Sequence, residues 1–166
     1  MEPSELARFE AAMLPHLDAA HNLARYLLRD DSAAADAVQD AYLRALRHFG
    51  GWRGGDARAW LLTIVRNVCR SARAEPAVEF DETLHSGEIA DRDPASDLAR
   101  RSARETLGEA LERLPEEFRE VIVLRELEEL SYKEIADVTG VPVGTVMSRL
   151  SRGRERLRRA LEGADA

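Results

Sequence analysis

Residues 131–152 read SYKEIADVTGVPVGTVMSRLSR, and this stretch is the most informative part of the chain. Ser131 and Glu134 have the spacing of a capping box that opens a short helix, and Gly140 is placed to end that helix. From Val141 a helical pattern resumes and continues to about Leu161. A short capped helix, a glycine turn and a second amphipathic helix together predict a helix-turn-helix.

The second helix of this motif carries a concentrated positive charge. Residues 149–159 hold six arginines and one glutamate, within a chain whose formal net charge is −7. Such a helix fits the DNA major groove, where its early residues approach bases and its later arginines approach phosphates. An arginine-rich face that is merely solvated is the alternative, and the local charge favours DNA contact. The predicted duplex contacts are Thr145, Ser148, Arg149, Arg152 and Arg156.

The rest of the chain also has helical periodicity, and no segment alternates like a strand. Residues 50–56, GGWRGGD, contain four glycines and predict a loop. We therefore expect an all-α protein. The further helices are expected at about residues 4–29, 33–49, 57–73, 98–114 and 115–130.

The periodicity stops between residues 74 and 97. Residues 73–97 contain eight acidic side chains and two arginines, together with Pro76 and Pro94. Low hydrophobicity, prolines and charge of one sign predict a flexible acidic linker. The chain then divides into two small helical bundles, residues 1–73 and residues 98–163, joined by linker 74–97.

The helix predicted at 57–73 has a polar face without an acidic residue. Arg66, Asn67 and Arg70 lie on this face, and Trp60 lies at its edge. Cations beside an aromatic ring suit single-stranded nucleic acid, whose bases stack and whose backbone needs positive charge. A tryptophan at such an edge also fits an ordinary core position, and the sequence leaves both interpretations open.

Composition and motifs exclude several classes of protein. The single cysteine, Cys69, excludes an internal disulfide and a multi-cysteine zinc site, and we expect it to be structural. The four histidines show no ligand spacing, and phosphate-loop and nucleophile motifs are missing. We therefore expect a non-enzymatic protein without metal or cofactor. No stretch approaches the ~18 apolar residues of a membrane span, and no signal peptide is evident, which favours a cytoplasmic location.

The order of these parts resembles a sigma factor of the extracytoplasmic-function (ECF, group IV) type in the sigma-70 family. The resemblance rests on ADAVQDAYLRALRHF at 35–49, on Trp52 and Trp60 with the LLTIVRN that follows, and on LPEEFREVIVLRELEELSYKEIADVTGVPVGTVMSRLSRGRERLRRAL at 114–161. It implies that residues 1–73 correspond to sigma region 2 and residues 98–163 to region 4. Many relatives have an aspartate where this chain has Ser71, and a basic residue where it has Met147.

The resemblance also implies roles and partners. The expected partners are core RNA polymerase, through its β′ clamp helices and β flap, promoter DNA and an anti-sigma factor. The region 4 helix would bind the −35 duplex through the residues named above. The residues implied to face the clamp helices are Asp36, Gln39, Asp40 and Leu43, and those implied to hold the melted −10 strand are Trp60, Arg66, Asn67 and Arg70.

Two alternatives belong to other functional classes. One is a dimeric helix-turn-helix regulator of duplex DNA, which would leave the first bundle without a role. The other is a sigma mimic that titrates an anti-sigma factor, which would not need arginines on both predicted DNA faces. For the sigma hypothesis we expect weak promoter binding by the isolated chain, because polymerase would hold both bundles at the required separation.

Overall fold

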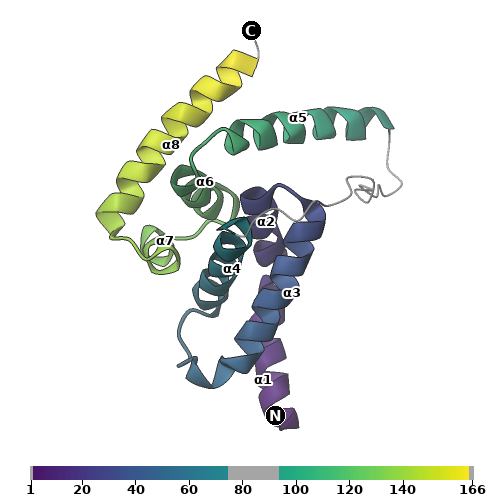
Figure 1. The fold of residues 1–166 in the computed structure, drawn as a ribbon, viewed down its shortest axis with the longest axis vertical. Helices are drawn as coiled ribbons and strands as arrows, with labels where there is room; N and C mark the ends of the chain where they lie inside the picture. The colour runs from purple at the N-terminus through teal and green to yellow at the C-terminus, as the bar shows by residue number, and fades with distance from the viewer. Residues whose placement is uncertain (1, 75–93, 165–166) are drawn as a thin grey trace.

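The computed structural model describes residues 2–74 and 94–164. Every regular element in these two ranges is helical, which confirms the all-α class (Figure 1). The first bundle occupies the lower half of the view and the second bundle the upper half. The helices are α1 Pro3–Met13, α2 Leu17–Leu28, α3 Asp31–Arg47, α4 Ala57–Ala74, α5 Pro94–Glu112, α6 Glu116–Ile122, α7 Tyr132–Thr139 and α8 Val143–Ala164.

The first bundle packs α2, α3 and α4 around a shared apolar core. Leu23, Leu27 and Leu61 are completely or almost completely buried at its centre. The continuous helix predicted over 4–29 is wrong, because the chain forms a short 3-10 turn at Leu14–His16 between α1 and α2. Pro15 lies in this turn, and a proline has no backbone N–H to donate to a continuing helix.

Local side-chain caps define the helix starts of this bundle. The Asp30 carboxylate accepts hydrogen bonds from the backbone N–H groups of Ser32 (2.9 Å) and Ala33 (3.4 Å) at the start of α3. Asp56 accepts one from Ala59 (3.1 Å) at the start of α4. Between these helices the glycine-rich loop bends at Gly54, whose φ of 78° favours glycine.

The second bundle contains the predicted helix-turn-helix as α7 and α8. The capping box is confirmed: the Ser131 hydroxyl accepts from the Glu134 N–H (3.1 Å), and the Glu134 carboxylate accepts from the Ser131 N–H (2.9 Å). Gly140 ends α7 in the left-handed conformation, with φ 75°. A Cβ at Gly153 would lie 3.1 Å from the Ile122 side chain, so this glycine allows α8 to approach α6 closely.

The helix predicted over 115–130 is wrong in its second half. Helix α6 ends at Ile122 and is followed by a π-helical turn, Val123–Leu127, in which the Glu128 N–H donates to the Val123 carbonyl (3.2 Å). Glu129 then takes a left-handed φ of 57°, which turns the chain toward α7.

The two bundles pack against each other through one continuous apolar core. Helix α4 of the first bundle lies beside α6 and α7 of the second bundle, as Figure 1 shows. The predicted linker of residues 74–97 ends earlier than expected, because α5 already begins at Pro94. Residues 75–93, which hold most of the linker's acidic side chains, lie outside the described residues.

One buried arginine ties the start of α6 to the end of α5. The Arg119 guanidinium, only 3% exposed, donates to the carbonyl oxygens of Leu111 (2.9 Å), Glu112 (3.0 Å) and Leu114 (2.8 Å). The last carbonyls of a helix lack partners from a following helical turn, and Arg119 supplies donors to them, in addition to the Leu114 N–H that donates to the Leu111 carbonyl (3.1 Å).

Arg119→Met is therefore expected to lower the free energy of unfolding by about 3 kcal/mol, because the carbonyls of Glu112 and Leu114 lose their side-chain donor and that of Leu111 keeps only the Leu114 N–H. Urea unfolding followed by circular dichroism measures this loss. Arg113→Met removes the same charge from an exposed side chain that forms no ion pair or side-chain hydrogen bond with the described residues, and it is expected to change the stability by less than about 0.5 kcal/mol. Equal effects of the two substitutions would contradict this role of Arg119.

Cys69 is buried in the core of the structure, which fits the structural role expected for it. Burial raises the pKa of its thiol to about 12, the negative charge of Glu116 adds to the rise, and Arg73 opposes it. A raised thiol pKa keeps the sulfur protonated at neutral pH, and the thiolate is the reactive form.

We therefore expect Ellman's reagent at pH 8 to react with the native chain at least about 100-fold more slowly than with the urea-unfolded chain. The unfolded chain is the control, since there the thiol regains its ordinary pKa and is accessible. Native Cys69 that reacts as fast as the unfolded thiol would show that this thiol is open to oxidation.

Candidate nucleic-acid and polymerase interfaces

The predicted duplex-contacting residues share the N-terminal part of α8. Ser148, Arg152 and Arg156 are exposed, and Thr145 and Arg149 are half-buried. Val146 and Leu150, on the opposite stripe of the helix, are buried against the rest of the bundle. The packing of α8 therefore turns a polar, basic face outward, as a groove-binding helix requires.

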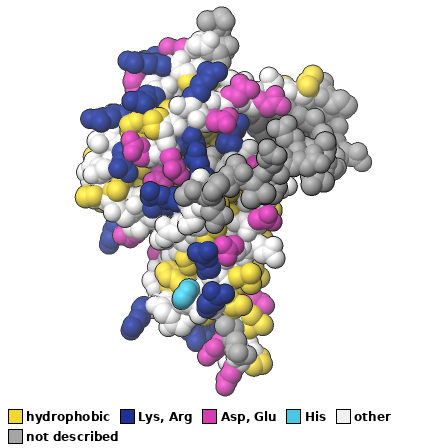
Figure 2. All heavy atoms as spheres, in the orientation of Figure 1, with side chains coloured by type: hydrophobic (Ala, Val, Ile, Leu, Met, Phe, Trp, Pro, Cys, Tyr) yellow, Lys and Arg dark blue, Asp and Glu magenta, His cyan; other side chains and the backbone are white. Residues whose placement is uncertain are grey.

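Three of the six arginines on α8 are paired with glutamates, which the sequence did not indicate. Figure 2 shows Lys and Arg side chains gathered over the region of α8 with acidic side chains among them. Glu126 pairs with Arg154 (2.7 Å), and Glu155 pairs with Arg158 (2.7 Å) and Arg159 (3.1 Å). In the described ranges, no carboxylate pairs with Arg149, Arg152 or Arg156. These three arginines are the cations that remain available to phosphates.

Arg156 has a second contact within the bundle. Its guanidinium lies over the Phe118 ring at 4.9 Å from the ring centre. A cation above an aromatic face is attracted to it and held in one orientation. The contact places Arg156 next to α6, at the end of the predicted duplex face that lies farther from the turn.

The residues predicted to hold a single strand are not all accessible. Asn67 and Arg70 of α4 are exposed, and Trp60 is half-buried. Arg66 is buried, because its guanidinium makes two hydrogen bonds to the Glu120 carboxylate of α6, at 2.7 and 3.0 Å. In this arrangement of the bundles, three of the four predicted side chains can reach a ligand and Arg66 cannot.

The glycine-rich loop does not present Trp52 as a free stacking surface. Trp52 stacks on Phe49 with ring centres 5.5 Å apart, and Phe49 in turn packs edge-on against Phe9. The loop tryptophan therefore belongs in part to the core of the first bundle.

The predicted polymerase-contacting residues form one stripe along α3. Asp36, Gln39 and Leu43 are exposed, and Leu43 is 55% exposed to solvent although it is apolar. Asp40 is half-buried and forms an ion pair with Arg44 (3.2 Å). The structure thus brings these four side chains together on one accessible helix face.

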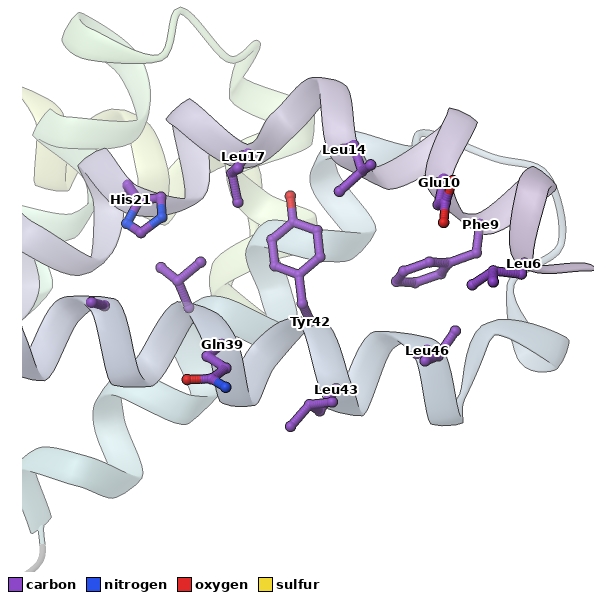
Figure 3. Close-up of a pocket in the computed structure, with 12 residues that line it drawn as sticks. Leu6, Phe9, Glu10, Leu14, Leu17, His21, Gln39, Tyr42, Leu43 and Leu46 are labelled. Atoms are coloured by element: carbon purple, nitrogen blue, oxygen red, sulfur yellow. The ribbon is translucent and has the colours of Figure 1, made fainter. Parts of the chain in front are cut away.

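An apolar groove that sequence reasoning missed lies beside this stripe. It has a volume of about 450 Å³ between α1, α2 and α3, and in Figure 3 Tyr42 points from α3 toward Leu14 and Leu17. The Tyr42 hydroxyl donates to the Met13 carbonyl (2.8 Å), and burial raises its pKa to about 12. The leucines of the groove with substantial exposure are Leu6, Leu14, Leu17 and Leu43.

Leucines on both sides of Pro15 were the available signal for this groove. The prediction of one long helix over 4–29 gave no reason to expect exposed leucines here, whereas the turn at Leu14–His16 leaves Leu14 and Leu17 partly exposed. Exposed leucines around a groove that continues into a polar stripe are typical of a protein-docking surface.

A third set of contacts joins the two bundles near the start of α4. Arg58 donates to the Glu128 carbonyl (3.2 Å) and to the Glu134 carboxylate (3.3 Å). A hydrogen bond with Asp56 lowers the pKa of Glu134 to about 2 and raises that of Asp56. The capping residue of the helix-turn-helix therefore also contacts the first bundle.

Residues 2–74 and 94–164 contain neither a metal-binding cluster nor a membrane-spanning helix. No group of three histidine, cysteine, aspartate or glutamate side chains in these ranges is arranged to hold a metal ion. None of the helices in these ranges combines the length and apolar character needed to cross a lipid bilayer.

Comparison with known proteins matches both bundles to one family. Residues 13–75 match the model of sigma-70 region 2, and residues 104–157 match that of sigma-70 region 4. The chain is 34% identical over 147 residues to the RNA polymerase sigma-H factor of Pseudomonas aeruginosa, covering 81% of this chain and 76% of that protein. It is 35% identical over 147 residues to the ECF RNA polymerase sigma-E factor of Escherichia coli, covering 80% and 75%.

Solved structures agree with the sequence matches. The sigma factor RpoE of Bartonella quintana, solved in complex with the anti-sigma factor NepR, aligns with a TM-score of 0.72 at 27% identity, covering 93% of this chain and 97% of that one. CnrH, solved in complex with the cytosolic domain of CnrY, aligns with a TM-score of 0.67 at 28% identity, covering 95% and 89%. This chain belongs to the sigma-70 family and is an RNA polymerase sigma factor of the ECF type.

Proposed function

We propose that this chain binds core RNA polymerase and directs it to promoters by contacting a −35 duplex and a melted −10 strand. The observation that carries the proposal is the presence, in one chain, of an outward-facing basic helix-turn-helix and a separate bundle with an accessible stripe on α3. A helix-turn-helix without the other bundle would be sufficient for a protein that only binds DNA. Both together fit a factor that joins polymerase to DNA.

The −35 contact is assigned to the exposed face of α8. Thr145 and Ser148 lie near the helix start, where side chains reach base edges. Arg149 and Arg152 have the planar donor groups that suit guanine edges or phosphates. Arg156, over the Phe118 ring, is placed to meet the phosphate backbone.

The −10 contact is assigned to Trp60, Arg66, Asn67 and Arg70 of α4. A tryptophan ring can stack on an unpaired base, and the arginines can neutralise the strand's phosphates. The amide of Asn67 can both donate to and accept from an unpaired base edge. Arg66 joins this set only when its bond to Glu120 is broken.

Polymerase binding is assigned to Asp36, Gln39, Asp40 and Leu43, which would face the clamp helices of β′. The second bundle would contact the β flap. An anti-sigma factor is a further expected partner, since RpoE and CnrH were solved with NepR and CnrY. The function needs no catalytic residue and is exerted in the cytoplasm, where polymerase and promoters are.

In vitro transcription with core polymerase and a library of genomic fragments tests the proposal. The wild-type chain is expected to produce specific start sites. The double substitution Arg149→Ala and Arg152→Ala is expected to reduce initiation at least about tenfold, because each good base or phosphate contact contributes about 1–3 kcal/mol. Arg113→Ala, at an exposed position remote from α8 in the sequence, serves as the charge control.

The outcomes separate the alternatives. A dimeric regulator would bind palindromic duplex DNA without polymerase, and a sigma mimic would bind an anti-sigma factor but give no start sites. Absence of specific initiation on every fragment would contradict the proposed function.

Leu43→Asp is expected to weaken binding to a β′ clamp-helix fragment at least about tenfold, because a charge would replace an exposed apolar contact at the centre of the stripe. Isothermal titration calorimetry measures the affinity. Leu98→Asp makes the same change at a leucine that is 69% exposed on α5, and we expect it to leave the affinity unchanged. Equal affinities for the two variants would show that the clamp binds elsewhere.

A further inference from the structure

The exposed side chains at the start of α8 are uncharged. Val146 and Leu150 are buried against the bundle, and the first exposed arginine of the helix is Arg152. The part of the helix that precedes Arg152 therefore presents apolar or small residues to a ligand. The exposed residues of this part are Val143, Gly144, Met147, Ser148 and Ser151.

Met147 is the largest of these exposed residues, and it is apolar. Its side chain is 52% exposed, and Val143, one turn earlier, is 39% exposed. Residues four apart are neighbours on a helix surface, so the two side chains form one apolar strip. Gly144 and Ser148 beside the strip carry little bulk, which allows this face of α8 to approach another surface closely.

A hollow lies beside Met147, between the outer face of α8 and the start of α7. It has a volume of about 630 Å³, and Tyr132 of α7 lines it. Figure 1 shows α7 next to the start of α8. The two arginines that line the hollow are both paired with glutamates, so this side of α8 attracts phosphates less than an unpaired arginine would. The pairs are Arg154–Glu126 (2.7 Å) and Arg158–Glu155 (2.7 Å).

The chemistry of Met147 matches one group in the DNA major groove. Among the four bases, thymine alone presents a methyl group there, on its C5 atom, and apolar side chains contact it. The methionine thioether is flexible and has no hydrogen-bond donor, so it adapts its shape to an apolar neighbour. The open hollow gives the Met147 side chain room for that adjustment.

We propose that Met147 is a specificity-determining residue that selects a thymine in the −35 duplex through contact with its 5-methyl group. The inference rests on the proposed function, since it takes α8 as the helix that enters the −35 major groove. Ser148 and Arg152 supply hydrogen bonds on the same face. Met147 adds an apolar contact that a cytosine at the same position would lack.

Initiation from templates whose −35 element is randomised identifies the position that Met147 contacts. Core polymerase with the wild-type chain is expected to select thymine there. Met147→Arg is expected to select guanine at the same position, because arginine pairs with the guanine edge. Met147→Leu keeps an apolar side chain of similar size and is expected to keep thymine.

Leu98→Arg is the matched control for this selection. It introduces the same charge at a leucine of α5 that is 69% exposed, and we expect it to leave the preference at every position unchanged. A Met147→Arg variant that initiates with the same preferences as wild type would overturn the inference.

Uracil in place of thymine tests the methyl group itself, because deoxyuridine pairs with adenine as thymidine does and lacks only the 5-methyl group. With core polymerase below saturation, the wild-type chain is expected to initiate about fourfold less often on the uracil template, which is the effect of one methyl group removed from water. Met147→Ala is expected to initiate equally often on both templates. The ratio is taken within each protein, so a general loss of activity in the variant cancels. Equal ratios for wild type and Met147→Ala would overturn the inference.

The same experiment distinguishes this inference from the proposed function. Specific initiation by the wild-type chain, without an effect of uracil at any thymine of the −35 element, refutes only the role of Met147. Absence of specific initiation refutes the proposed function, and the role of Met147 with it.

Discussion

The buried bond between Arg66 and Glu120 is the interaction on which the arrangement of the two bundles depends. Apolar packing between α4 and the second bundle excludes water from the pair, and loss of either partner would leave the other charge unpaired in the apolar interface. Geometry adds specificity, because two parallel hydrogen bonds fix both the distance and the orientation of the helices that carry them. The partly exposed ion pairs around it contribute little energy individually, but they have the same polarity, with the arginine in the first bundle and the glutamate in the second: Arg29–Glu112, Arg58–Glu134 and Arg73–Glu116.

This polarity explains how an acidic protein can carry DNA-binding faces. A net charge of −7 argues against nucleic-acid binding only if the charge is spread evenly. In this chain the acids are concentrated in residues 75–93 and on the helices that support α8, while the arginines gather on α4 and α8. The glutamates that cover α4 lower the net charge and at the same time occupy its cations. Acidity and DNA binding are therefore properties of different parts of one molecule.

The sequence predicted the local features well, because short-range contacts determine them. The capping box of Ser131 and Glu134 and the glycine stop at Gly140 need only neighbours three to five residues apart. Periodicity failed where another constraint prevailed: Pro15 interrupts the first helix, and a π-helical turn ends α6. The candidate sites were likewise predictable only where contacts between near neighbours in the sequence determine them. A polar face on α4 was visible, but no local pattern could show that a glutamate 54 residues away binds its central arginine.

The apolar groove is accessible while the two bundles are packed, whereas the Arg66–Glu120 pair is buried. Leu14, Leu17 and Leu43 remain partly exposed while the bundles are packed, so the surface that fits another protein is ready before the surface that fits a DNA strand. Binding energy gained on the α3 stripe can then be used to break the Arg66–Glu120 bond, provided that polymerase binds the separated bundles more tightly than the packed ones. A factor built this way would expose its strand-binding cations mainly where a polymerase is present to use them.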